Sequence, residues 1–156
     1  MTNQNLQHII NGKKVTGTSS TVFDIYNPST GQKINKMQGA SANDVRQAID
    51  SADAAFEHWK KVPPSKRAQI MFNYRELLYK NVEELAELIS IEHGKTLADA
   101  KGEVMRGVEV VEFCTAINSH LKSDYTADVS ANIDSYNLRQ PLGVCAGITP
   151  FNFPAM

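Results

Sequence analysis

The first part of the chain alternates short apolar runs with turn residues, a pattern typical of small β-hairpins. Asn11-Gly12 separates two such runs and is a dipeptide favoured in type I′ turns. Val22 to Tyr26 has the period-2 alternation of a strand, and a turn sequence then leads to a second strand expected from Gln32 to Met37. We therefore predict a peripheral β arm over residues 8 to 38.

Four helices are predicted next, because apolar residues recur at spacings of three and four. The first begins at Ser41, where Asp44 completes a pattern that resembles a capping box, and it ends at Pro63-Pro64. The third ends at Gly94, a residue type that suits the position after a helix. The apolar positions of the second, third and fourth helices fall within residues 70–78, 82–89 and 97–121.

The end of the sequence is its most apolar part. Residues 122–135 are polar and predict an exposed loop, a strand is expected from Ser135 to Gln140, and residues 143–149 form a short apolar run bounded by proline and glycine. Such a run is typical of a fully buried strand with neighbours on both sides. Because soluble domains seldom end on a buried strand, we expect a fragment. The order of elements indicates an α/β protein whose parallel sheet has only begun.

Composition narrows the class of protein. A chain of 156 residues is long enough for one domain with a sizeable core. Its formal net charge of -1 gives no reason to expect binding to nucleic acid or to an anionic membrane. No run approaches the roughly 20 apolar residues that span a bilayer, and the first residues lack the features of a secretory or transit peptide. With two cysteines far apart, we expect a cytoplasmic protein with reduced thiols.

The residues argue against several kinds of site. The four histidines are scattered, and none is paired with another histidine or a cysteine at ligand spacing, so no metal site is expected. Neither a P-loop nor a G-x-G-x-x-G fingerprint occurs. Cys145 lies in the expected buried strand without a histidine near it in sequence, and a structural role is favoured for both Cys145 and Cys114.

Asn152 is the first candidate for chemistry. It stands between two phenylalanines, in a segment bounded by Pro150 and Pro154, at the carboxyl end of the expected buried strand. Open α/β sheets bind their ligands at that end. The side-chain amide could donate a hydrogen bond to an oxyanion. Asparagine is also common in turns, and the residues alone leave both interpretations open.

Arg106 is the second candidate. It lies in the expected fourth helix with glycines on either side, and its guanidinium could present a bidentate fork to a carboxylate. A solvated charge paired with Glu103 or Glu109 explains the same residue, and the helical spacing favours that explanation. Glu92 to Lys95 is interpreted as a helix end with a glycine stop and a cation near the carbonyl terminus.

Several stretches carry a resemblance to a known family. Pro141-Leu142-Gly143-Val144, followed by Ile148 to Pro154, resembles the start of the cofactor-binding domain in the aldehyde dehydrogenase superfamily. Glu92 to Thr96 matches another motif of that superfamily. Gly102 to Phe113, together with Ile148 to Pro154, is most similar to the CoA-acylating methylmalonate-semialdehyde dehydrogenases. The resemblance covers nearly the whole chain but only about the first third of such an enzyme.

The resemblance implies a fold and a division of the chain. It implies the N-terminal part of a Rossmann-type cofactor domain, with a β arm, four helices and the first strands of the sheet. Residues 1–121 would hold the β arm and the helices, and residues 122–140 the start of an oligomerisation hairpin. Residues 141–156 would hold the first buried strand of the NAD-binding sheet.

The resemblance also implies roles for individual residues. Asn152 matches the oxyanion-hole asparagine of the family. Arg106 matches the arginine expected to hold the substrate carboxylate, which reverses the preference drawn from spacing. The positions that match the lining of the NAD site, largely through main chain, are Thr149, Pro150 and Phe151. The nucleophilic cysteine of the family, its general-base glutamate and the lysine at the NAD ribose would all lie beyond this chain.

On this basis we predict the N-terminal part of an NAD-dependent oxidoreductase of the homo-oligomeric aldehyde dehydrogenase type. Its small-molecule aldehyde would be (methyl)malonate semialdehyde, which is oxidised and decarboxylated to propanoyl-CoA or acetyl-CoA with CoA as acyl acceptor. The fragment alone is expected to be inactive. Two alternatives stay open: a general aldehyde dehydrogenase that hydrolyses its thioester and needs no CoA, and a non-catalytic module that binds NAD or a partner.

Overall fold

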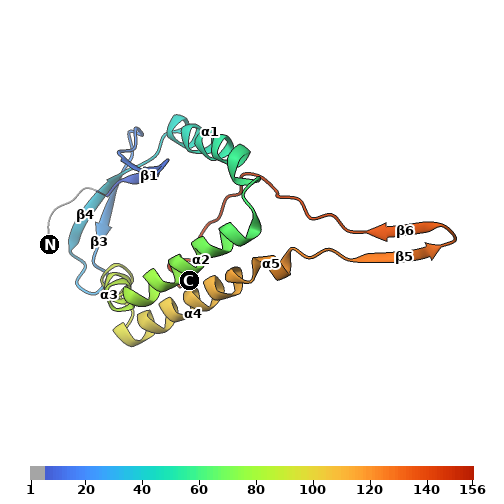
Figure 1. Cartoon of the computed structure of the whole chain (residues 1–156). Helices are drawn as coiled ribbons and strands as arrows, with labels where there is room; N and C mark the ends of the chain where they lie inside the picture. The colour runs from blue at the N-terminus through green and yellow to red at the C-terminus, as the bar shows by residue number, and fades with distance from the viewer. Residues whose placement is uncertain (1–5) are drawn as a thin grey trace.

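The structure is a computed structural model that describes residues 6–156. In Figure 1 the β arm lies at the upper left and α1 lies above the helices α2 to α4, while a long hairpin projects to the right beyond α5. The strands are β1 (His8–Ile10), β2 (Lys13–Val15), β3 (Val22–Tyr26), β4 (Lys33–Gln38), β5 (Tyr125–Ser130) and β6 (Ile133–Tyr136). The helices are α1 (Ala42–Trp59), α2 (Pro64–Lys80), α3 (Val82–His93), α4 (Leu97–Thr115) and α5 (Ile117–His120).

The β arm consists of two antiparallel hairpins, as the sequence predicts. β1 pairs with β2 across Asn11 and Gly12, whose φ angles of 51° and 70° are those a type I′ turn requires. β3 pairs with β4 in the same antiparallel sense. The two-residue turn and the period-2 pattern are local signals, so the sequence was sufficient for this region.

The capping box predicted at the start of α1 is present and also joins the β arm to the helix. The Asp44 backbone N–H donates to Ser41 Oγ at 3.2 Å, and the Ser41 N–H donates to Asp44 Oδ2 at 2.8 Å. The same carboxylate oxygen accepts from the backbone N–H and the hydroxyl of Thr18, each at 2.8 Å. Hydrogen bonds from Ser41 and then Thr18 hold the pKa of Asp44 well below its usual range.

Helices α3 and α4 enclose the hydrophobic core. The cluster joins three buried residues of α3 to two of α4: Val82, Ala86, Ile89, Ala100 and Val104. Helix α2 also packs against α4. The fourth predicted helix is interrupted, since the Ala116 N–H bonds to Phe113 O and the short α5 then begins. None of the helices in residues 6–156 combines the length and apolar character needed to cross a bilayer.

Residues 122–135 are exposed, but the prediction of a loop there is wrong because β5 and β6 form an antiparallel hairpin. Polar side chains, which the sequence analysis interpreted as those of a solvent-exposed loop, hold the register of this hairpin. Asp134 accepts from the Tyr125 hydroxyl at 2.5 Å and from the Asp128 N–H at 3.0 Å. Asn132 and Asp128 adopt positive φ, which asparagine and aspartate tolerate best among non-glycine residues. The hairpin is what the family resemblance implies for this region.

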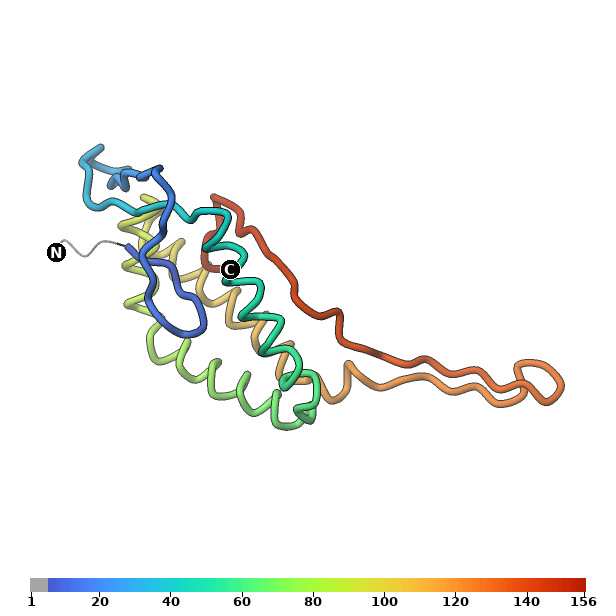
Figure 2. Tube along the Cα trace, turned by 90° about the horizontal axis from the view of Figure 1, so that it is seen from above, coloured from blue at the N-terminus to red at the C-terminus, as the bar shows by residue number. Residues whose placement is uncertain are grey.

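The segment 137–156 differs most from the sequence prediction. No strand forms over 135–140 beyond the end of β6 at Tyr136, and none forms over 143–149. Ile148 is 100% exposed rather than buried. Figure 2 shows this segment returning from the hairpin past α1 to the helices as an unpaired trace. A strand forms only where a neighbouring strand supplies backbone hydrogen bonds. None of the other residues within 6–156 pairs with this segment as a neighbouring strand.

Candidate active site

Helix α4 carries the predicted substrate residue on an accessible surface. The Thr96 hydroxyl caps the helix by accepting from the Asp99 N–H at 3.2 Å. Arg106 lies in the middle of the helix and is exposed. Within residues 6–156 its guanidinium makes no hydrogen bond or ion pair, so the pairing with Glu103 or Glu109 favoured by spacing is wrong. The guanidinium therefore has all its donors available for a ligand.

The true partner of Glu103 is Lys95, in the turn between α3 and α4. Gly94 ends α3 with a φ of 86°, and a Cβ there would lie 3.0 Å from Pro28 Cγ, so the turn requires glycine for two reasons. Ser90 Oγ donates to Lys95 O at 2.9 Å and fixes the turn. Lys95 Nζ then lies 2.6 Å from Glu103 Oε2, with the lysine side chain only 11% exposed.

Glu103 is a buried carboxylate whose oxygens both have partners. The residue is 1% exposed. Burial by itself raises the pKa of Glu103, but hydrogen bonds from Lys95 and from the N–H groups of Ala155 and Met156 outweigh it, and the pKa is lowered. The carboxylate is therefore charged at neutral pH and is a strong acceptor inside the fold.

The two buried charges hold the last residues of the chain. Lys95 Nζ donates to Asn152 O at 2.9 Å and lies 4.6 Å from the centre of the Phe153 ring. Glu103 Oε1 accepts from Ala155 N at 2.7 Å and from Met156 N at 3.3 Å. These contacts bring a segment without secondary structure against helix α4.

The result is a cavity of about 460 Å³ between the helices and residues 152–153. Its lining residues are His93, Lys95, Ala98, Asp99, Gly102, Glu103, Arg106, Asn152 and Phe153. The cavity thus brings together Arg106 and Asn152, which the sequence analysis named separately. The Asn152 side chain is exposed and has no hydrogen-bond partner among residues 6–156. A guanidinium that can bind a carboxylate and a side-chain amide that can donate a hydrogen bond therefore line the same cavity.

Three lining residues were missed as functional candidates. His93 and Lys95 were interpreted as a helix end, and Glu103 as a surface partner of Arg106. His93 Nδ1 is buried without a hydrogen-bond partner in the described part of the chain. The match of Glu92 to Thr96 with a family motif was the signal that could have drawn attention to this turn.

The three residues matched to the NAD site lie outside this cavity. Thr149, Pro150 and Phe151 follow one another in the unpaired segment, and Phe151 is 90% exposed. Their main-chain groups take part in no ladder, so they are accessible to a ligand. The resemblance matches them to the NAD site, and they line neither this cavity nor the one between β1 and α1.

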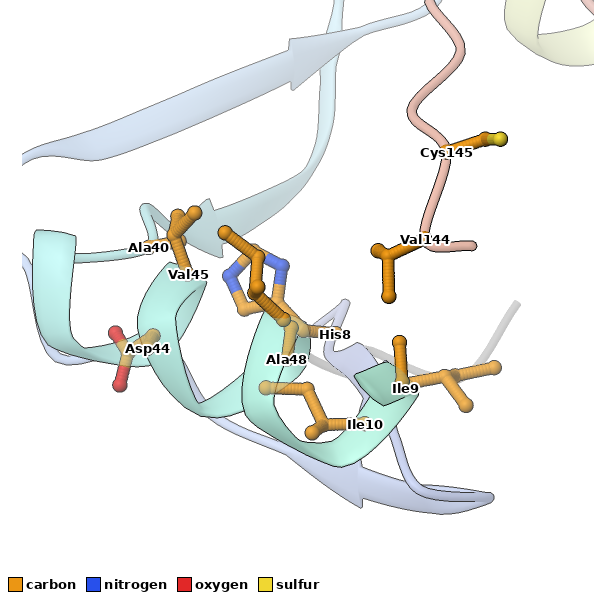
Figure 3. A pocket seen from close by; sticks show the side chains of 11 residues that line it. His8, Ile9, Ile10, Ala40, Asp44, Val45, Ala48, Val144 and Cys145 are labelled. Carbon is orange, nitrogen blue, oxygen red and sulfur yellow. The ribbon is translucent and has the colours of Figure 1, made fainter. Parts of the chain in front are cut away.

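A second cavity, of about 390 Å³, offers no comparable chemistry. It is lined mainly by apolar residues of β1 and α1 together with Val144 and Cys145. In Figure 3 Val144 points toward Ile9 across this space, whereas the Cys145 sulfur points away from it. His8 Nε2 is engaged with Gln38 O at 3.0 Å. Cys145 is exposed rather than buried, because the strand expected around it does not form.

Among residues 6–156 no group of three or more histidines, cysteines, aspartates and glutamates is placed to hold an ion. Arg106 can bind an anion in the cavity, and the Asn152 side chain can donate a hydrogen bond there.

Comparison with known proteins gives the same answer as the motifs. The sequence model of the aldehyde dehydrogenase family matches residues 14–156. Malonate-semialdehyde dehydrogenase of Pseudomonas aeruginosa is 48% identical over 151 residues, which are 97% of this chain and 30% of that protein. A Dictyostelium discoideum protein assigned as an acylating mitochondrial methylmalonate-semialdehyde/malonate-semialdehyde dehydrogenase is 43% identical over 147 residues, 94% of this chain and 28% of its own length.

A solved structure supports the fold. The crystal structure of a Sinorhizobium meliloti protein assigned as a methylmalonate-semialdehyde dehydrogenase, in complex with NAD, matches with a TM-score of 0.93 and 46% identity. The match covers 99% of this chain and 32% of that one. The predicted fold class is confirmed, and the chain spans about a third of the length of the relatives it matches.

Proposed function

The chain belongs to the aldehyde dehydrogenase family, and from that premise we propose that it is the N-terminal portion of an NAD-dependent, CoA-acylating (methyl)malonate-semialdehyde dehydrogenase. The observation that carries the proposal is the cavity shared by Arg106 and Asn152. A semialdehyde of this kind has a carboxylate at one end and an aldehyde at the other, a few atoms apart. A site for it needs a cation and an oxyanion donor in one small space.

Arg106 supplies the cation. Its guanidinium is exposed to the cavity and free of ion pairs within residues 6–156, so it can form two parallel hydrogen bonds to the substrate carboxylate. This contact distinguishes a semialdehyde from an aldehyde with an uncharged tail. The names of the related semialdehyde dehydrogenases support this substrate class.

Asn152 supplies the oxyanion donor. As a nucleophile adds to the aldehyde carbon, negative charge develops on the oxygen, and a fixed amide N–H lowers the barrier by donating to it. The nucleophile and the general base are expected outside residues 1–156, so this chain binds and orients the substrate and does not complete the reaction. We expect residues 1–156 alone to be inactive.

A bound NAD would supply the hydride acceptor for oxidation of the aldehyde carbon. Thr149, Pro150 and Phe151 would contribute exposed main-chain groups to its site, and the NAD complex of the Sinorhizobium relative supports this assignment. CoA enters the proposal as a substrate that takes the acyl group, and the acylating name of the Dictyostelium relative supports it. The exposed β5–β6 hairpin would join subunits of a homo-oligomer, because an isolated two-stranded hairpin is only marginally stable in water.

The proposal is tested with the protein at the length in which its source organism makes it. We expect NADH to form from NAD, methylmalonate semialdehyde and CoA, and we expect Asn152→Ala to lower kcat about 100- to 1000-fold. Asn43→Ala, a change at an exposed asparagine of α1, is the matched control and should leave kcat unchanged. The absence of NADH formation would overturn the proposal.

The same assay separates the two alternatives. NADH formation at an equal rate without CoA, with release of the free acid, would indicate the general hydrolytic enzyme. An intact cellular protein with the mass of this chain alone, binding NAD without turnover, would indicate the non-catalytic module.

A further inference from the structure

The segment that carries Asn152 has no secondary structure, yet it contacts the helices at four points. Lys95 makes two of the contacts, with the Asn152 carbonyl and the Phe153 ring, and Glu103 makes the other two, with the Ala155 and Met156 N–H groups. All four contacts are to main-chain atoms or to a ring face. None of them uses the Asn152 amide, which stays available in the cavity.

General stability does not explain why this ion pair is buried. Removing two charges from water costs roughly as much as their attraction returns, so buried pairs add little to folding free energy compared with apolar residues of the same size. A buried pair does fix geometry, because every partner is needed to satisfy the two charges. Glu103 has no exposed side-chain area, and each of its oxygens bonds a different element.

A second lysine–glutamate pair also involves helix α4 and provides a contrast. Lys101 of α4 pairs with Glu83 of α3, and the two side chains are 50% and 67% exposed. Within residues 6–156 neither residue makes a hydrogen bond or an ion pair with residues 152–156. The exposed pair joins α3 to α4, whereas the buried pair joins the turn before α4 to that helix and also binds residues of the segment 137–156.

We propose that Lys95 and Glu103 are positioning residues for the oxyanion donor Asn152. The catalytic role in this inference rests on the proposed function. The contacts of Lys95 and Glu103 with the segment are observed independently of that function. Lys95 fixes the peptide carbonyl of Asn152, which restricts the direction of the side chain. Glu103 fixes the backbone N–H groups of Ala155 and Met156, which follow Pro154.

The position of Glu103 on α4 couples this restraint to the substrate site. Glu103 and Arg106 are three residues apart, one helical turn, on the same helix. The helix that presents the carboxylate-binding arginine therefore also holds the segment that presents the amide. A substrate with fixed length between its two ends requires both to be set on one rigid element.

The structural arm of the test uses the chain of 156 residues and does not depend on any activity. Amide hydrogen exchange at Ala155 and Met156, followed by NMR, reports the two bonds to Glu103. We expect Lys95→Met to speed exchange at both amides about tenfold or more, and Lys101→Met to leave it unchanged. Glu103→Gln, which keeps the shape and an acceptor oxygen, is the second variant if Lys95→Met does not fold. Unchanged exchange in these variants would overturn the inference.

The kinetic arm uses the protein at its natural length and counts turnover per folded molecule. We expect Lys95→Met to lower kcat about 10- to 100-fold with the KM for the semialdehyde near its parent value, and Lys95→Arg to restore part of the loss. A merely structural pair would change the folded fraction and leave kcat per folded molecule intact, which would also overturn the inference. If no variant, the parent included, forms NADH, the proposed function fails, and the exchange data still decide whether the pair holds the segment.

Discussion

Helices α3 and α4 and the segment 137–156 are both rich in apolar residues, but the structure places them in opposite environments. Val104 and Val108 of α4 are buried against neighbouring helices, whereas Leu142, Ile148 and Phe151 lie almost fully in solvent. The difference lies in where each region finds its hydrogen-bonding and packing partners. A helix forms its backbone hydrogen bonds internally and needs neighbours only to cover its apolar face. A strand needs neighbours both for its backbone hydrogen bonds and to cover its apolar side chains. The segment is held instead by two charged side chains.

The largest expected effect comes from breaking the contact between the two regions. Lys95→Met leaves the Glu103 carboxylate buried without its cation, and we expect the free energy of unfolding to fall by about 3–5 kcal/mol. Lys101→Met, which breaks the exposed pair with Glu83, should lower it by less than about 1 kcal/mol. Urea unfolding followed by circular dichroism measures both. Equal losses in the two variants would show that burial of the pair has no consequence.

A pair of truncations compares the two regions directly. Val108 is 0% exposed, and Val108→Ala should lower the free energy of unfolding by about 1–3 kcal/mol through lost burial and a small cavity. Ile148→Ala, at a fully exposed position, should change it by nothing measurable. A comparable loss from Ile148→Ala would mean that the segment packs against something in solution, and the contrast drawn above would be wrong.

The local features of this fold were predictable because their signals are local. Asn11-Gly12, the Ser41–Asp44 capping box and Gly94 each act within a few residues, and the structure confirms all three. The strand expected over 143–149 was wrong, since an apolar run encodes the preference to pair but does not supply a partner.

The candidate site was predictable only in part. Arg106 and Asn152 were named from residue chemistry and family resemblance, and the structure adds that they share a cavity. The contact between Lys95 and Asn152 joins residues far apart in sequence through a main-chain carbonyl, which leaves no trace in residue type. The pairing of Glu103 with Lys95 was hidden because it joins the turn before α4 to a residue eight positions further along, a separation that matches no side-chain spacing within one helix.

The smallest expected effect concerns the other end of the molecule, where Asp44 joins α1 to the β arm. Since hydrogen bonds from Ser41 and Thr18 lower the folded-state pKa of Asp44, its contribution to stability is complete above the unfolded-state pKa of about 3.9 and is lost as the pH falls toward the folded-state value. Asp44→Asn should therefore be less stable than the parent at pH 7, and the gap should narrow below about pH 4. Thermal unfolding across this pH range measures the gap, and a gap independent of pH would contradict the assignment.

The central claim is that Arg106 and Asn152 bind the two ends of one substrate. The most direct measurement compares kcat/KM for malonate semialdehyde and for propanal, an aldehyde of the same length without the carboxylate, in the natural-length protein and its Arg106→Leu variant. We predict a loss of about 10- to 100-fold for the semialdehyde and no change for propanal, with Arg46→Leu, at an exposed arginine of α1, as the control. An equal loss for both aldehydes, or no loss for the semialdehyde, would contradict the claim.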